Sequence, residues 1–214
     1  MARQTKQEFV YNYIHDRIFS CEFPPGTPLT EEGLSQELNV SRTPVREAIQ
    51  RLTSEGLLDV TPGVGLSVSQ IRLDDLLEIY ELRMGLESLA VKLFIEKRNL
   101  NLTEELSNTL SLATKAVEES DIDLFMEHDM KFHSIIAAGT RNKRLISSLD
   151  NIYGQINRMS MYVRTDSEIR EITVVEHKKI LDAIIESDVD AAVAASEVHC
   201  MSGRKFYLKQ LYNL

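Results

Sequence analysis

The sequence is short of positive charge and of cysteine. Its 24 Lys and Arg residues stand against 33 Asp and Glu residues, which gives the 214 residues a formal net charge of -9. This balance excludes a nonspecific polyanion binder that relies on a broad basic surface, although a small basic cluster on one helix can still reach a DNA groove. The two cysteines, Cys21 and Cys200, are far apart, so neither a disulfide framework nor a cysteine metal site is expected.

Long hydrophobic runs are also missing. No apolar stretch approaches the roughly 20 residues that a membrane-spanning helix needs. The amino-terminal stretch MARQTKQEFVYNYI lacks the basic and then apolar pattern of a secretory signal. We therefore expect a cytoplasmic protein that does not enter a membrane.

Proline is absent after Pro62. All 5 prolines precede residue 70, and they fall partly in the turn-forming stretches PPGTP (24–28) and TPGVG (61–65). This change in composition along the chain predicts two domains. Residues 1–70 would form short elements, and residues 71–214 would form long amphipathic helices. The fold class is therefore predicted to be mainly α.

In residues 1–70 the pattern predicts three helices and a hairpin. Apolar residues at helical spacing predict a helix over 5–20, and a second helix follows Thr30, with glutamates in its first turn. A third helix is expected over VSRTPVREAIQRL (40–52), capped by Ser41 or Thr43. LLDVT and LSVSQI then alternate as strands do, joined by PGVG. Three helices followed by a hairpin form a winged helix-turn-helix.

Residues 71–214 are predicted to form an all-α bundle of six helices. The short connections carry Ser, Thr, Asp or Asn residues that can cap the following helix. The expected helices span 73–98, 103–119, 122–138, 143–164, 168–187 and 189–212.

The third helix carries two faces of different character. An apolar stripe at i, i+3, i+4 and i+7 must face the core, namely Val45, Ala48, Ile49 and Leu52. A polar group suited to DNA lies beside it, namely Arg42, Thr43, Arg46 and Gln50. Arginine can bind guanine or phosphate, glutamine can pair with adenine, and threonine can reach phosphate or a thymine methyl group. Two arginines four apart can also mark a solvated helix face, but the preceding turn and the following hairpin favour a recognition helix.

The stretch LTEEGLSQELNVSRTPVREAIQRLTSEGLL resembles the DNA-binding domain of the GntR family of bacterial transcription regulators, most specifically through SRTPVREA. The resemblance implies that Arg42 and Arg46 contact operator DNA and that the wing glycine, Gly65, approaches the minor groove. The expected DNA-binding residues are Ser41, Arg42, Thr43, Arg46, Gln50 and Gly65.

Two positions depart from this family pattern. Many relatives carry an arginine where this chain has Glu32, and a basic residue where it has Val64 before the wing glycine. Both departures remove phosphate contacts, and residues 1–70 carry a net charge of 6 − 9 = −3. Two-fold binding of a homodimer to a palindromic operator is therefore expected.

Histidines form the second candidate site. Asp129 and His133 are i and i+4 in HDMKFHSII, so both can reach one ion. His177 and His199 are 199 − 177 = 22 residues apart. This separation allows the chain to finish one helix, turn and return along an antiparallel helix, so that His199 lies at about the level of His177. One carboxylate and three imidazoles suit zinc, nickel, manganese or iron. The alternative is that these histidines are hydrogen-bonded core residues.

The second part is similar to the FCD ligand-binding domain of one GntR branch through IYELRMGLESLAVKL, DMKFHSIIA, EHKKILDAI and the histidine of EVHCM. Its helix count resembles the shorter, VanR-like members. The resemblance implies that Asp129, His133, His177 and His199 hold a divalent metal inside the bundle. His128, turned about 100° from Asp129, is expected at the surface or beside a ligand.

Arg83 lies near a buried helix face and needs a partner. That partner is either a ligand carboxylate or a salt bridge to Glu81, Glu87 or a neighbouring helix. The family resemblance favours binding of a small organic acid as effector, and Arg158 is a second candidate for this role.

The function expected from these features is a transcription repressor that responds to a small carboxylate effector. A metal-dependent hydrolase is the alternative, but no HExxH motif or nucleophile elbow is present, and the only candidate bases are His128 and Glu176. A third possibility is a protein-interaction module with a purely structural bundle.

Overall fold

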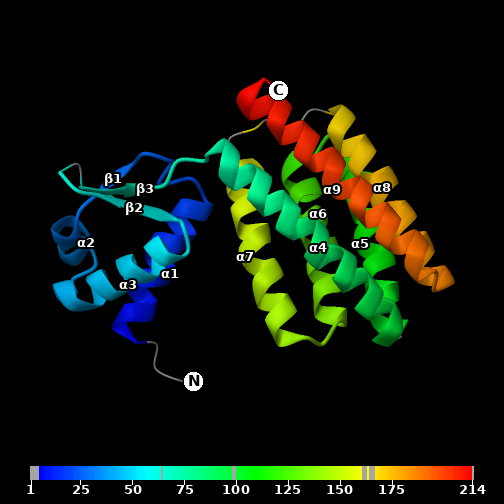
Figure 1. Ribbon diagram of the computed structural model, residues 1–214, viewed down its shortest axis with the longest axis horizontal. Coiled ribbons are helices and arrows are strands. Elements are labelled where there is room, and N and C mark those ends of the chain that lie inside the picture. The colour runs from blue at the N-terminus through cyan, green and yellow to red at the C-terminus, as the bar shows by residue number, and fades with distance from the viewer. Residues whose placement is uncertain (1–4, 64, 98–99, 161–162, 164–166, 214) are drawn as a thin grey trace. The chain divides into compact units, whose positions relative to one another are not determined.

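The computed structural model describes residues 5–63, 65–97, 100–160, 163 and 167–213. The chain divides into two compact units, Met1–Arg72 and Leu73–Leu214 (Figure 1). Val64, one of the two departures from the family pattern, lies outside the described residues.

The first unit is a winged helix-turn-helix. Its helices are α1 (Lys6–Phe19), α2 (Glu31–Glu37) and α3 (Arg42–Ser54), and its strands are β1 (Pro28–Leu29), β2 (Leu58–Thr61) and β3 (Gly65–Val68). The antiparallel sheet has the order β1-β3-β2. Strand β1 was not predicted because two residues are too few to show the alternation that identifies a strand.

The N-cap residues Thr5, Thr30 and Ser41 mark where the three helices begin. Thr5 and Glu8 form a capping box at the start of α1, and Thr30 Oγ1 accepts a 2.9 Å hydrogen bond from the Gly33 N–H in α2. Ser41 occupies the N-cap position of α3, although its side chain makes no capping hydrogen bond. The choice left open by the sequence, Ser41 or Thr43, therefore falls on Ser41.

The predicted apolar stripe of α3 is buried against α1 and the sheet. Its members share a core with residues from α1, α2, β2 and β3, namely Val10, Ile14, Ile18, Leu34, Val45, Ala48, Ile49, Leu52, Leu58 and Val68. Burial of this stripe leaves the opposite side of α3 exposed to solvent, which fixes the surface that the unit can offer to DNA.

The second unit consists of six helices in the described residues. They are α4 (Leu73–Lys97), α5 (Leu100–Glu118), α6 (Ile122–Gly139), α7 (Lys143–Ser160), α8 (Ser167–Glu186) and α9 (Val189–Tyr212). The mainly α fold class predicted from the sequence is confirmed. Helix α5 begins three residues earlier than predicted, and Leu102, within that extension, packs against the core. Helix α7 ends at Ser160, whereas the sequence predicted 143–164, part of which lies outside the described residues.

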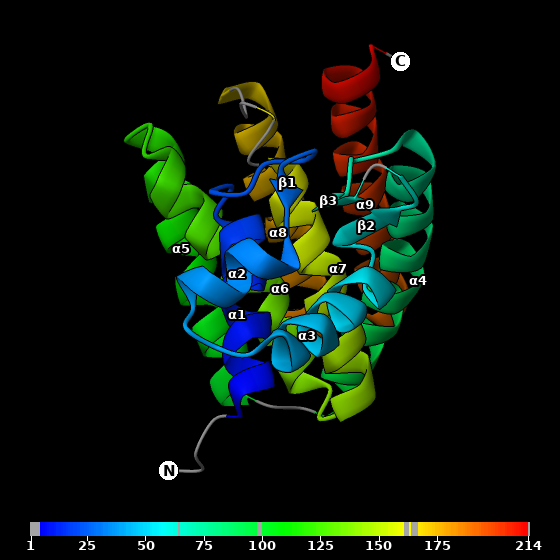
Figure 2. The same cartoon turned by 90° about the vertical axis from the view of Figure 1, so that its left-hand side faces the viewer.

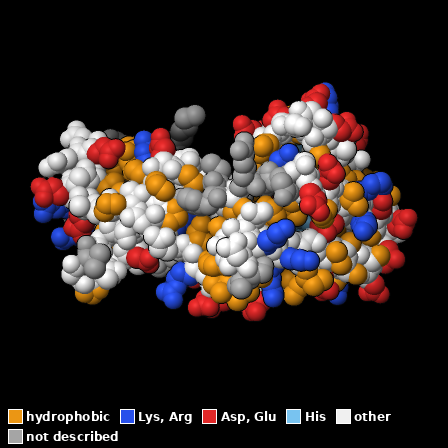
Figure 3. Space-filling model, turned by 90° about the horizontal axis from the view of Figure 1, so that it is seen from above, with side chains coloured by type: hydrophobic (Ala, Val, Ile, Leu, Met, Phe, Trp, Pro, Cys, Tyr) orange, Lys and Arg blue, Asp and Glu red, His pale blue; other side chains and the backbone are white. Residues whose placement is uncertain are grey.

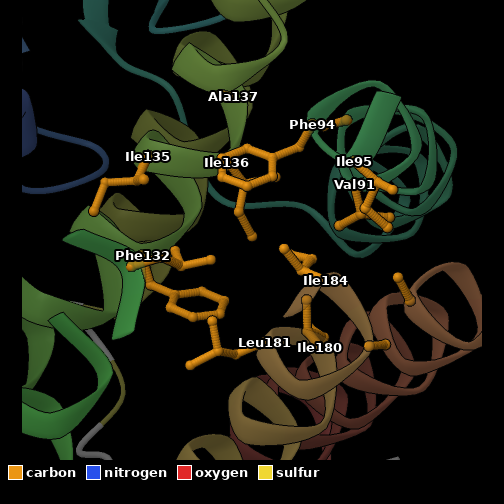
Figure 4. Close-up of a cluster of buried hydrophobic side chains, with 14 of the residues drawn as sticks. Val91, Phe94, Ile95, Phe132, Ile135, Ile136, Ala137, Ile180, Leu181 and Ile184 are labelled. Atoms are coloured by element: carbon orange, nitrogen blue, oxygen red, sulfur yellow. The ribbon is translucent and has the colours of Figure 1, made fainter. Parts of the chain in front are cut away.

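Apolar side chains from α4, α6 and α8 meet in the centre of the bundle, where Phe94, Phe132, Ile136, Ile180, Leu181 and Ile184 point toward one another (Figure 4). Gly139 allows α6 to approach this cluster closely, because a Cβ atom there would lie 2.1 Å from Cδ2 of Phe94. None of the described helices is both long enough and apolar enough to cross a membrane.

Candidate metal centre and DNA-binding surface

Three histidines from three different helices converge inside the second unit. His133 on α6, His177 on α8 and His199 on α9 are all buried. The Nε2 atom of His177 lies 3.2 Å from Nε2 of His133 and 3.4 Å from Nε2 of His199. Because α8 and α9 are neighbours that run in opposite directions, the 22-residue separation does return His199 to the level of His177.

Carboxylates lie beside the Nδ1 atoms of two of these histidines. His133 Nδ1 lies 3.3 Å from Oε1 of Glu87, and His199 Nδ1 lies 3.1 Å from Oε2 of Glu176. Glu176 also accepts a 2.6 Å hydrogen bond from the hydroxyl of Ser202. An imidazole that donates its Nδ1–H to a carboxylate keeps the lone pair on Nε2, which is the atom that can bind a metal.

Burial also sets the protonation of the cluster. It lowers the pKa of His133 well below the usual value, and the positive charge of Arg83 lowers it further. Burial lowers the pKa of His177 in the same way, with the nearby histidines adding to the effect. Both side chains are therefore neutral at neutral pH, which is the form that coordinates a cation.

The spacing of the nitrogens fits a single ion. Two nitrogen ligands at about 2.1 Å from an ion and separated by roughly 90 to 109° at that ion lie about 3.0 to 3.4 Å apart. The observed separations of 3.2 and 3.4 Å fall in this range. Among the described residues, these three histidines are the group whose donor atoms all lie within 4.8 Å of one another.

Asp129 lies at the edge of this group, one turn before His133 on α6. Its Oδ1 atom is 3.7 Å from Nε2 of His177, and that buried oxygen accepts no hydrogen bond from the described residues. Burial raises the pKa of this carboxyl group, against the lowering effect of His199 and Arg83. A buried acceptor without a donor is costly, and a bound cation would satisfy it.

Arg83 reaches the same point from α4. Its Nε donates a 2.7 Å hydrogen bond to Oε1 of Glu87, so one of the salt bridges considered from the sequence is present. Its Nη2 lies 3.2 Å from Nε2 of His133 and 3.1 Å from Nε2 of His199. A buried guanidinium therefore borders the three imidazoles.

A cavity of about 70 Å³ opens beside the cluster, and its lining mixes charged and aromatic side chains, including Arg83, Asp129, Glu176, His199, Tyr80, Phe125, Phe206 and Tyr207. Arg158 on α7 is buried but is not among the described residues that line this cavity. The structure therefore brings Arg83 to the histidines.

The expectation of a surface position for His128 is wrong. Its side chain is buried, with 8% of its surface exposed. Helix α6 packs against α4, α5 and α7, so a rotation of 100° away from Asp129 still points into the bundle. The orienting residues Glu87 and Glu176 were not assigned to histidines from the sequence, although Glu87 was named as a partner for Arg83.

The polar side of α3, a helix whose place in the first unit Figure 2 shows, forms the second candidate site. All five residues predicted on this helix, Ser41, Arg42, Thr43, Arg46 and Gln50, are exposed. Sequence reasoning did not identify the carboxylates that meet the arginines. Arg46 Nε donates a 2.7 Å hydrogen bond to Oε2 of Glu31, and Arg42 Nη2 lies 3.5 Å from Oε2 of Glu32.

The wing presents bare backbone at Gly65. This residue begins β3 opposite Thr61 and has a φ of 115°, which L side chains rarely adopt. A Cβ atom there would meet nothing within 4 Å. Gly65 therefore leaves open space beside its backbone, into which another surface can approach.

Comparison with known families identifies both units. The model of the "FCD domain" matches residues 78–201, and the model of "Bacterial regulatory proteins, gntR family" matches residues 6–68. The chain belongs to the GntR family and carries an FCD domain. It is a DNA-binding transcription regulator, so the hydrolase considered from the sequence has no support.

Other GntR-type regulators are similar along most of the chain. The HTH-type transcriptional regulator YdhC of Bacillus subtilis (strain 168) is 29% identical over 183 residues, which are 85% of this chain and 82% of that protein. The HTH-type transcriptional repressor RspR of Escherichia coli (strain K12) is 26% identical over 196 residues, which are 92% of this chain and 86% of the repressor.

Solved structures share the fold of this GntR regulator. Escherichia coli McbR/YncC superposes with a TM-score of 0.78 at 23% identity, covering 97% of this chain and 99% of that one. The Zn2+-bound FCD domain of the transcriptional regulator TM0439 has a TM-score of 0.53 at 19% identity, covering 65% of this chain and 95% of that domain.

Proposed function

We propose that this GntR regulator is a homodimeric repressor that binds a palindromic operator and changes its DNA affinity when a small organic acid binds beside a divalent metal in the FCD domain. One observation carries the proposal. Three imidazole nitrogens, a buried carboxylate oxygen without a donor and a buried guanidinium all face one point in the second unit.

His133, His177 and His199 would hold the ion, with Asp129 as a fourth ligand. Zinc, nickel, manganese and iron all accept imidazole and carboxylate ligands. The solved structure of a Zn2+-bound FCD domain, that of TM0439, supports this assignment. When bound, the ion would supply a positive charge that attracts an anionic ligand.

Arg83 suits the recognition of an acid. It lines the cavity and already binds one carboxylate, that of Glu87, through Nε. Its Nη2 amino group borders the histidines, where a second carboxylate could accept from it. The small cavity volume, about 70 Å³, favours a short organic acid over a large ligand.

Dimerisation is supported by an apolar face on α4. Leu82 and Leu89, two turns apart on one side of this helix, are 56% and 42% exposed. Leu82 also lines a groove between α4 and α7 together with Ile79 and Ile152, and the other side chains that line this groove are polar. On the face of the second unit that Figure 3 shows, hydrophobic side chains are interspersed with charged ones. The two-fold symmetry of a homodimer would supply two α3 helices for the two halves of a palindrome. The name of RspR supports repression.

The metal is tested by elemental analysis of the purified full-length protein after supplementation with each candidate metal and removal of excess. About one ion per chain is expected in the wild type and in His128→Ala, which removes a buried histidine outside the cluster. The ion should be lost in His177→Ala. Equal metal contents in the two variants would contradict the ligand assignment.

The response to effector is tested by measuring operator affinity, with a duplex selected from a random library, in the presence of a panel of short mono- and dicarboxylic acids. Acids that bind the protein by calorimetry are expected to change operator affinity by at least about fivefold. The change should be absent in Arg83→Gln. Operator affinity unaffected by every acid that binds would refute the sensing role.

A further inference from the structure

The first turn of α2 supplies carboxylates to the arginines of α3. Glu31 and Glu32 directly follow the N-cap residue Thr30, where the helix dipole favours negative charge. Helices α2 and α3 lie side by side (Figures 1 and 2). Each glutamate thereby reaches one arginine of the recognition helix, Glu31 reaching Arg46 and Glu32 reaching Arg42.

The two ion pairs differ in geometry. Glu31 accepts from the Nε of Arg46 at 2.7 Å, whereas Glu32 lies 3.5 Å from a terminal nitrogen of Arg42. Within the described part of the chain, Glu31 is the only hydrogen-bond partner of Arg46. The Arg46 side chain is 61% exposed, so Nη1 and Nη2 remain open to solvent. These two groups form the fork that binds O6 and N7 of guanine end-on.

We propose that Glu31 is a positioning residue for DNA specificity, which holds Arg46 by its Nε so that the two terminal amino groups face a guanine. An arginine without this restraint can turn to the flanking phosphates, which carry no sequence information. The negative charge of Glu31 also repels phosphates, so it lowers affinity for DNA of any sequence. Glu31 therefore raises discrimination while it weakens nonspecific binding.

Glu32 provides a matched comparison on the same turn. It carries the same charge, but its looser contact with one terminal nitrogen of Arg42 does not leave that fork free. Removing either glutamate should strengthen binding to all duplexes through the lost repulsion. Only the removal of Glu31 should weaken discrimination at the guanine that Arg46 binds. This role of Glu31 depends on α3 as the recognition helix and not on the metal or the effector.

The test uses the full-length protein and a duplex selected from a random library. The guanine that Arg46 reads is identified first, as the base pair whose replacement weakens binding by the wild type but not by Arg46→Ala. The wild type should prefer the guanine duplex by about 5- to 150-fold, the range of one bidentate contact. Thermal melts before each titration check that every variant is folded.

Three variants then separate the effect of Glu31 on the position of Arg46 from the effect of its negative charge. Glu31→Ala should reduce the preference for guanine at least threefold and strengthen binding to an unrelated duplex. Glu31→Gln, which keeps an acceptor for the Arg46 Nε, should restore the preference and keep the stronger unrelated binding. Glu32→Ala should strengthen binding to both duplexes with the preference unchanged. Equal preferences in Glu31→Ala and Glu32→Ala would overturn the proposal, whereas an Arg46→Ala variant that binds every duplex like the wild type would overturn the recognition helix itself.

Discussion

The two units hold an arginine by the same short contact in opposite surroundings. Arg46 Nε and Glu31 in the first unit are 2.7 Å apart, as are Arg83 Nε and Glu87 in the second. The side chains of the first pair are 61% and 39% exposed, and those of the second are 6% and 5% exposed. Equal length therefore does not mean equal energy. Water and salt screen the first pair, whereas each partner of the second relies on the other to compensate its buried charge.

Breaking the buried pair should have the largest effect. Glu87→Ala leaves the guanidinium of Arg83 buried without its carboxylate and also removes the acceptor of His133 Nδ1. We expect the free energy of unfolding to fall by about 3 to 5 kcal/mol. Urea unfolding followed by circular dichroism measures this change. A loss below about 1 kcal/mol would show that Arg83 finds another partner.

Loading the buried site should stabilise the second unit. At a free zinc concentration of about 100 times Kd, the free energy of unfolding should rise by about 2.7 kcal/mol, and a chelator should reverse the gain. The rise in Tm is measured by differential scanning calorimetry, where it should appear in the wild type and not in His177→Ala. Equal rises in both proteins would place the ion elsewhere.

The contrast between buried and exposed positions should also hold for residues without charge. Gly139→Ala would place a Cβ atom 2.1 Å from the ring of Phe94, so we expect a loss of about 1 to 3 kcal/mol in unfolding free energy. Ser134→Ala, at an exposed position of the same helix, should stay within about 0.5 kcal/mol of the wild type. Both are measured by urea unfolding. Similar values for the two variants would mean that Phe94 moves aside freely.

Breaking the exposed pair should have the smallest effect on folding. Glu31→Ala should lower the free energy of unfolding by less than about 1 kcal/mol, and the difference should vanish in about 1 M salt. The loss in Glu87→Ala should persist at that salt concentration because its pair is shielded from solvent. A Glu31→Ala loss that is equally insensitive to salt would remove the distinction between the two units.

The spacing of hydrophobic residues and the helix-capping residues predicted most of the fold. The apolar stripe of α3 and the helices of the second unit follow from spacing, and Asp121 and Asp188 cap α6 and α9 in the short connections that the sequence indicated. Strand β1 could not be found, because its two residues are recognised only by their pairing with Ser67 and Leu66.

Sequence spacing was a weaker guide to the sites. It placed His177 and His199 at the same height in the bundle, because residues at similar distances from the turn of an antiparallel helix pair lie side by side. It could not assign Glu176 to His199 or Glu31 to Arg46, because those contacts depend on how two helices cross. The expectation that His128 lies at the surface was wrong for the same reason. The angular position of a residue on a helix gives the direction of its side chain, but it does not say whether a neighbouring helix packs on that side.

Glu87 connects three helices through a single carboxylate, accepting from Arg83 on α4 and bordering His133 on α6 and Cys200 on α9. Helix α4 begins at Leu73, directly after the last residue of the first unit. The 87 − 73 = 14 residue steps from Leu73 to Glu87 span about 21 Å along the helix. The carboxylate that borders His133 thus stands on the same continuous helix whose first residue directly follows the DNA-binding unit.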